Sequence, residues 1–127
     1  MEIMKKEKLY EKLSEFEQYK KDWNDTFSSE PIKKECIEAA KQIIEGLENS
    51  PHYISPVLDG NVRLHWDNDK NKKWLTVKIY ISNKEIEKEL MLEIEYESFE
   101  ENIEMYNYIP LERYKSLDGM IDILING

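Results

Sequence analysis

The spacing of apolar residues changes along this chain, and that change is the strongest constraint on its fold. Before Asn49, apolar residues recur every three or four positions. After Gly60, apolar and polar residues alternate one by one. A period near 3.6 is typical of an amphipathic helix, and a period of two is typical of a strand with one buried face. The chain therefore predicts helices first and a sheet afterwards.

Three alternating runs predict long strands, and residues 103–109 and 54–58 predict a fourth full strand and a short one. Turn-forming residues at 59–61 and 67–71 indicate short links, which favour an antiparallel meander. The residues expected to face the core are Val62, Leu64 and Trp66 in the first run, Leu75, Val77, Ile79 and Ile81 in the second, and Leu90, Leu92, Ile94 and Tyr96 in the third.

The flanking segments predict helices. An apolar stripe runs from Leu9 to Phe27, and Ser28-Ser29-Glu30-Pro31 has the composition of a helix start. A second stripe over 32–47 ends before Pro51, and a third begins at Leu111. We expect one α+β domain over residues 1–127. Its antiparallel sheet has four to five strands, with two N-terminal helices and a C-terminal helix packed on one face.

The cysteine content and the apolar runs of the sequence indicate the cellular compartment of the protein. Cys36 is the single cysteine among 127 residues, so no intramolecular disulfide forms. It lies in the second apolar stripe, which predicts a buried and inert thiol, with a reactive thiol as the alternative. The N-terminal residues 1–7 are charged and have no signal-like apolar stretch, and no apolar run approaches the ~20 residues that span a bilayer. We expect a cytoplasmic protein without a membrane partner.

The net charge of −9 is concentrated in the last third of the chain. Residues 82–127 hold 12 acidic and 4 basic side chains. Arg63 and Arg113 are the two arginines, and arginine is the residue best suited to bidentate recognition of phosphate and guanine. A strongly negative field also repels nucleic acid. The charge therefore argues against direct nucleic-acid binding and favours a basic protein partner.

The segment His65-Trp66-Asp67-Asn68-Asp69 is the best candidate for a metal or acid–base site. Alternation places His65 and Asp67 on one side of a strand, about 7 Å apart, which provides two ligands where zinc needs three or four. Residues 67–71 are similar to the start of a calcium loop, but Lys72 and Lys78 stand where that loop needs glycine and glutamate. No nucleophile motif or phosphate-binding glycine loop is present. We expect a strand and a polar turn, no metal, no cofactor and no enzymatic activity.

Glu93, Glu95 and Glu97 alternate along one predicted strand, and Glu89 extends the row. Lys78 and Arg63 on neighbouring strands are candidates to neutralise part of this charge, because cross-strand neighbours interact. The row is either a solvated face with cross-strand ion pairs or an anionic platform for a basic partner. Aromatic residues are enriched at binding hot spots, and those with the outward phase are Trp74, Tyr80, Tyr106 and Tyr108. The predicted partner-binding residues are Trp74, Tyr80, Glu93, Glu95 and Glu97.

Residues 20–81 carry elements that resemble a loose group of small, uncharacterised bacterial and phage proteins. These elements are Trp23-Asn24-Asp25, Ala39-Ala40, the stretch from Pro56 to Trp66, and Leu75-Thr76-Val77-Lys78-Ile79. The group has a Trp-Asp-Gly-like element and a Pro-x-x-Asp-Gly-x-Val-x-Leu-x-Trp stretch. This chain departs from it at Asn24-Asp25, where the group tends to Asp-Gly, and at His65, where the group tends to glutamate. The resemblance implies a shared fold and no particular activity.

The function we expect is that of an acidic protein-binding module. It would inhibit or neutralise a basic partner, in the manner of an antitoxin, an immunity protein or a phage counter-defence protein. One alternative is a structural module that forms a homodimer through its outward aromatic residues. A second alternative is a small-ligand protein with a pocket between the sheet and the helices.

Overall fold

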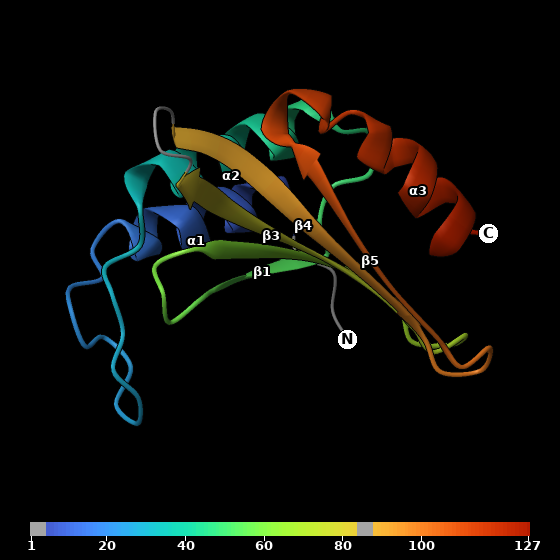
Figure 1. Cartoon of the computed structure of the whole chain (residues 1–127), viewed down its shortest axis with the longest axis horizontal. Coiled ribbons are helices and arrows are strands. Elements are labelled where there is room, and N and C mark those ends of the chain that lie inside the picture. Colours follow the sequence, from blue (N-terminus) through green and yellow to red (C-terminus); the bar gives the residue numbers. More distant parts are fainter. Residues whose placement is uncertain (1–4, 84–87) are drawn as a thin grey trace.

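The computed structural model describes residues 5–83 and 88–127. The prediction that residues 1–7 form no signal-like stretch therefore lies largely outside the described residues. Within the described part, a five-stranded antiparallel sheet has the order β1-β2-β3-β4-β5, so each strand pairs with the next one in sequence (Figure 1). The predicted α+β class and meander are confirmed. The elements are α1 (Lys6–Phe16), α2 (Lys34–Gly46), β1 (Tyr53–Pro56), β2 (Val62–Asn68), β3 (Lys73–Asn83), β4 (Lys88–Ser98), β5 (Ile103–Pro110), the 3-10 helix η1 (Leu111–Arg113) and α3 (Ser116–Leu124).

One face of the sheet is buried against the helices. Trp66 is its largest fully buried side chain, and its Nε1 donates a hydrogen bond to the Asn49 carbonyl at 3.0 Å. That bond removes the cost of burying the indole N–H. The other buried residues of this face share the phase of Trp66 and are Ile54, Val62, Leu64, Leu75, Val77, Ile79, Leu92, Ile94 and Tyr96. The predicted buried phase is therefore confirmed, although Ile81 and Leu90 are only partly buried against the core. The opposite phase faces away from the helices.

The first helix is shorter than its apolar stripe predicts. Leu9, Leu13 and Phe16 are fully buried, but α1 ends at Phe16 and the chain then enters a loop. Asp22 has a φ of 61°, a left-handed conformation that no helix continues, and its N–H donates to the Ser29 carbonyl at 2.7 Å. Phe27, predicted to continue the stripe, is 62% exposed on this loop.

The predicted cap of the second helix is also wrong. Residues 30–33 form no helix because their backbone groups bond to the turn before β2. The Glu30 N–H donates to the Leu58 carbonyl, and the Lys33 N–H donates to the Gly60 carbonyl, both at 2.8 Å. Helix α2 consequently starts at Lys34, and Ser29 accepts a hydrogen bond from the Asn24 N–H instead of capping it.

The C-terminal helix is fixed to the middle of the chain by polar contacts. Asp118 accepts hydrogen bonds at 3.0 Å from the backbone N–H groups of Glu48 and Asn49 and from the Asn49 side chain. At its other end, the Asn68 side chain donates to the Ile125 carbonyl at 2.8 Å. The helix predicted from Leu111 onward is therefore a 3-10 turn followed by α3, tied to the segment after α2 and to the end of β2.

Replacing Gly60 with alanine is expected to destabilise the fold. Gly60 has a φ of +87°, and an added Cβ would lie 2.5 Å from the Pro31 carbonyl oxygen. Strain at such a position costs on the order of 1–3 kcal/mol. The matched control is Gly119→Ala in α3, where an added Cβ meets nothing within 4 Å and should raise stability by up to about 1 kcal/mol. Urea denaturation measures both, and equal stability of the two variants would contradict this account.

Candidate functional site

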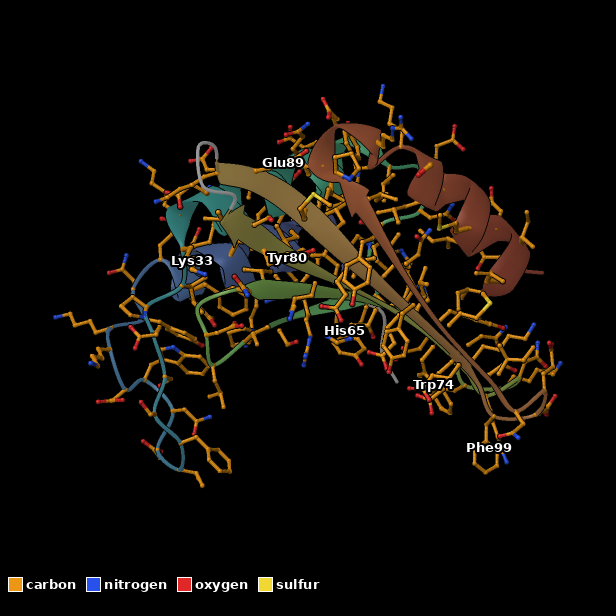
Figure 2. All side chains as sticks on the ribbon, in the orientation of Figure 1. Lys33, His65, Trp74, Tyr80, Glu89 and Phe99 are labelled. Atoms are coloured by element: carbon orange, nitrogen blue, oxygen red, sulfur yellow. The ribbon has the colours of Figure 1, made fainter. Side chains whose placement is uncertain are left out.

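The side of the sheet that faces away from the helices forms a continuous surface, which we call the open face. Cross-strand pairing divides it into rows that start on β1, β2 or β3 and end on β5. Figure 2 labels His65, Trp74 and Tyr80 along β2 and β3. The rows are Asp67–Trp74–Glu97–Glu104, then Tyr53–His65–Thr76–Glu95–Tyr106, then Ser55–Arg63–Lys78–Glu93–Tyr108, and finally Tyr80–Met91–Pro110.

Lys78 neutralises one member of the predicted acidic row. Its Nζ lies 3.2 Å from a carboxylate oxygen of Glu93, its partner across the β3–β4 ladder, and 5.7 Å from the ring centroid of Tyr80. Two of the five predicted partner-binding residues, Glu93 and Tyr80, are thus in contact with a cation of their own chain. Arg63, the other predicted neutralising residue, forms no ion pair within the described part.

The remaining predicted residues lie together at the other end of the open face. Trp74 is opposite Glu97, which is opposite Glu104, and Glu95 is opposite Tyr106. We call these five residues the acidic half of the face. Within the described residues, none of its three carboxylates forms an ion pair. Like charges this close repel one another, so a cation brought to this surface would be attracted.

The hydroxyl of Tyr106 lies between two of these carboxylates. It donates a hydrogen bond to Glu104 and lies 3.4 Å from Glu95. The bond to Glu104, together with desolvation and the charge of Glu95, raises the pKa of Tyr106 to about 12. The ring is 54% exposed, and Tyr108 beside it is 55% exposed. An exposed aromatic ring therefore lies beside two carboxylates that form no ion pair among the described residues.

His65 is enclosed in a polar network on the same face. Its Nε2 lies 2.8 Å from the Ser55 hydroxyl, its Nδ1 lies 3.4 Å from the Thr76 hydroxyl, and Tyr53 stacks on the ring at 4.3 Å between centroids. Burial, and secondarily the charge of Arg63, lowers the pKa of His65 to about 4. A serine–histidine pair that transfers protons in catalysis has a carboxylate on the second ring nitrogen to stabilise the imidazolium. Here a hydroxyl occupies that place, so the network holds a neutral ring.

The other candidate residues of the sequence are not brought together. Cys36 is fully buried, as predicted, and burial raises the pKa of its thiol to about 11. Residues 69–72 form the turn between β2 and β3, as predicted for a polar hairpin. Over residues 5–83 and 88–127, no three His, Cys, Asp or Glu side chains converge to hold a metal ion. No helix in the same part of the chain is long and apolar enough to cross a membrane.

The centre of the open face has no deep pocket. The hollow bordered by Arg63, Thr76, Lys78, Glu93 and Glu95 has a volume of only about 10 Å³. Pockets for small ligands are typically about 300–1,000 Å³. A larger hollow of about 280 Å³ lies at the other end of the sheet, bordered by Lys88, Glu89, Leu90, Pro110, Leu111 and Glu112. The part of the face around Glu93 and Glu95 therefore suits contact with a macromolecule better than enclosure of a small molecule.

Comparison with protein-family models, curated proteins and solved structures finds no match. The candidate site is therefore inferred from the geometry of this structure alone.

Glu104 is the member of the acidic half that the sequence interpretation missed. It lies on β5, beside Glu97 and between the hairpin turn and Tyr106. The alternation over residues 103–109 that predicted the strand also gives Glu104 the phase of Tyr106 and Tyr108. What the pattern could not give is the register that sets Glu104 opposite Glu97, because register depends on the length of the turn.

The low pKa of His65 predicts a pH-dependent stability. The unfolded histidine has a pKa near 6.5, and in the folded protein the value is about 4. Between these values only the unfolded chain binds the proton on this histidine. The contribution of neutral His65 to the free energy of unfolding is therefore fully present above about pH 6.5 and is lost as the pH falls to about 4. We expect His65→Gln to lose less thermal stability than the wild type between about pH 7 and pH 5. Equal slopes of Tm against pH for the two proteins would contradict the assignment.

Proposed function

We propose that this protein binds a basic surface of another protein through the acidic half of its open face. The carrying observation is that Glu95, Glu97 and Glu104 lie on the open face, and that none of them forms an ion pair in the described part of the chain. Trp74 and Tyr106 lie beside them. Complementary charge steers association, and aromatic side chains supply buried contact at a hot spot.

The acidic residues of the open face differ in how strongly they would attract a cationic partner. Lys78 already neutralises Glu93, so the attraction for a partner comes from the rows that contain Glu95 and Glu97. His65 belongs to one of these rows and adds no positive charge near neutral pH, because its pKa is about 4. The carboxylates without an ion pair among the described residues, Glu95, Glu97 and Glu104, therefore lie toward the β4–β5 turn. An inhibitory or neutralising role, of the antitoxin, immunity or counter-defence kind, would follow if the basic surface is the active surface of the partner.

A charge reversal at the acidic half tests this function. The variant is Glu95→Lys with Glu97→Lys, and the matched control is Glu35→Lys with Glu38→Lys, two exposed positions on α2. Both change the net charge equally, but only the first changes the open face. Each immobilised protein is used to capture partners from lysate of the source cells. We expect basic proteins bound by the wild type and the control to be lost from the sheet variant.

The association rate of a purified captured partner gives the quantitative test. Steering by charge raises such rates by about 10–10³-fold at low salt and weakens as salt is added. The sheet variant should associate at least about tenfold more slowly than the control, with a flatter dependence on salt. If the sheet and α2 variants slow association equally, net charge alone acts and the proposed site is wrong. Partner binding that is indifferent to salt would also contradict it.

A further inference from the structure

The strand β5 forms one edge of the sheet. β5 is the last strand of the sheet, and no further strand pairs with it among the residues that the structure describes. Six of its eight residues are exposed. Strand edges of this length usually pair with another segment or are blocked, because their unpaired N–H and C=O groups bind any extended chain.

A side-chain contact identifies which backbone groups face the edge. The Tyr108 N–H donates to Oδ1 of its neighbour Asn107 at 2.9 Å, so it is directed away from β4. Backbone groups alternate between the two sides of a strand. The N–H and C=O groups of Glu104 and Tyr106 are therefore directed to the same free edge. Asn107 satisfies one of these donors itself, which limits unselective pairing until a partner strand displaces it.

The two faces of β5 differ in a way that specifies the incoming strand. On the open face β5 presents Glu104, Tyr106 and Tyr108. On the other face it presents Ile103 and Met105, which are 36% and 47% exposed. Figure 1 shows this end of the β4–β5 ribbon extending past α3. A strand beside β5 would thus place one row of side chains against carboxylate and tyrosine rings, and the other row against apolar residues.

We propose that β5 binds an extended basic segment of the partner as a sixth, antiparallel strand. This inference rests on the proposed function, because it names how the basic partner is held. The segment alternates cationic and apolar residues: cations lie opposite Glu104, Tyr106 and Tyr108, where they form ion pairs and cation–π contacts, and apolar residues pack on Ile103 and Met105. A second copy of this chain fits less well, because pairing two β5 edges would bring together two acidic ribbons.

Selectively methylated peptides test the backbone pairing. The probe is a peptide of eight residues, the length of β5, in which lysine and valine alternate. Directly opposed residues of an antiparallel pair point to the same face, so the lysines lie opposite Glu104, Tyr106 and Tyr108 and their amides are directed to β5. N-methylation of the lysine amides should weaken binding by about tenfold or more, whereas N-methylation of the valine amides should leave it nearly unchanged. The two isomers have the same charge and composition, so electrostatic attraction alone predicts equal affinity.

Equal binding of the two isomers would overturn edge pairing while leaving electrostatic binding at the open face intact. No measurable binding of the unmethylated peptide, even at low salt, would also overturn it. In either case, binding of captured partners to the variant Glu95→Lys with Glu97→Lys remains a separate test of the proposed function.

Two substitutions at Tyr106 test the same edge from the protein side. Proline removes the N–H directed to the edge without removing a bond to β4, and threonine removes the same ring but keeps the N–H. We expect Tyr106→Pro to bind the unmethylated peptide at least about fivefold more weakly than Tyr106→Thr. Thermal melting checks that both variants are folded. Equal affinity of two folded variants would contradict pairing at this edge.

Discussion

The helices of this protein cover one face of a sheet whose side chains alternate strictly between two faces. Burying Trp66, Leu75, Val77 and their neighbours under α1, α2 and α3 removes a large apolar area from water. The same packing leaves every second residue of β2, β3, β4 and β5 on the other side. The location of the proposed interaction surface is a direct consequence of how the core is formed, since the core residues and the displayed residues are neighbours in sequence.

The cross-strand partner of each glutamate decides whether its charge on the open face is neutralised. Glu93, Glu95 and Glu97 are equivalent in the sequence pattern, yet Lys78 pairs with Glu93 and no cation pairs with the other two within the described residues. The difference arises because Lys78 lies opposite Glu93 in the ladder, while Thr76 and Trp74 lie opposite Glu95 and Glu97. A uniform acidic row thereby becomes a neutralised part and an attractive part. The free edge of β5 adjoins the attractive part, so surface charge and unpaired backbone groups are offered together.

The structure differs from the sequence prediction at the end of α1 and the start of α2, where side chains or backbone groups contact distant parts of the chain. The apolar stripe of α1 continues in sequence through Tyr19 and Trp23, but these rings stack on each other in a loop, at 5.1 Å between centroids. Ser29 and Pro31 have the composition of a helix start, but residues 30–33 bond to the carbonyls of Leu58 and Gly60. No local pattern reveals a hydrogen-bond acceptor that lies almost thirty positions away along the chain, so the helix boundaries were predicted less well than the strands.

The sequence by itself determined the α+β class, the strand segments, the phase that is buried and the excess of acid near the C-terminus. These follow from local periodicity and composition, which act through each residue's own preference for water or for the core. Tertiary structure alone decided that β5 is an edge and that Glu104 joins Glu95 and Glu97. It also decided that Lys78, one of the two predicted neutralising residues, pairs with Glu93. Register and strand order place residues from separate segments side by side, and the energies that select those positions exist only once the segments meet.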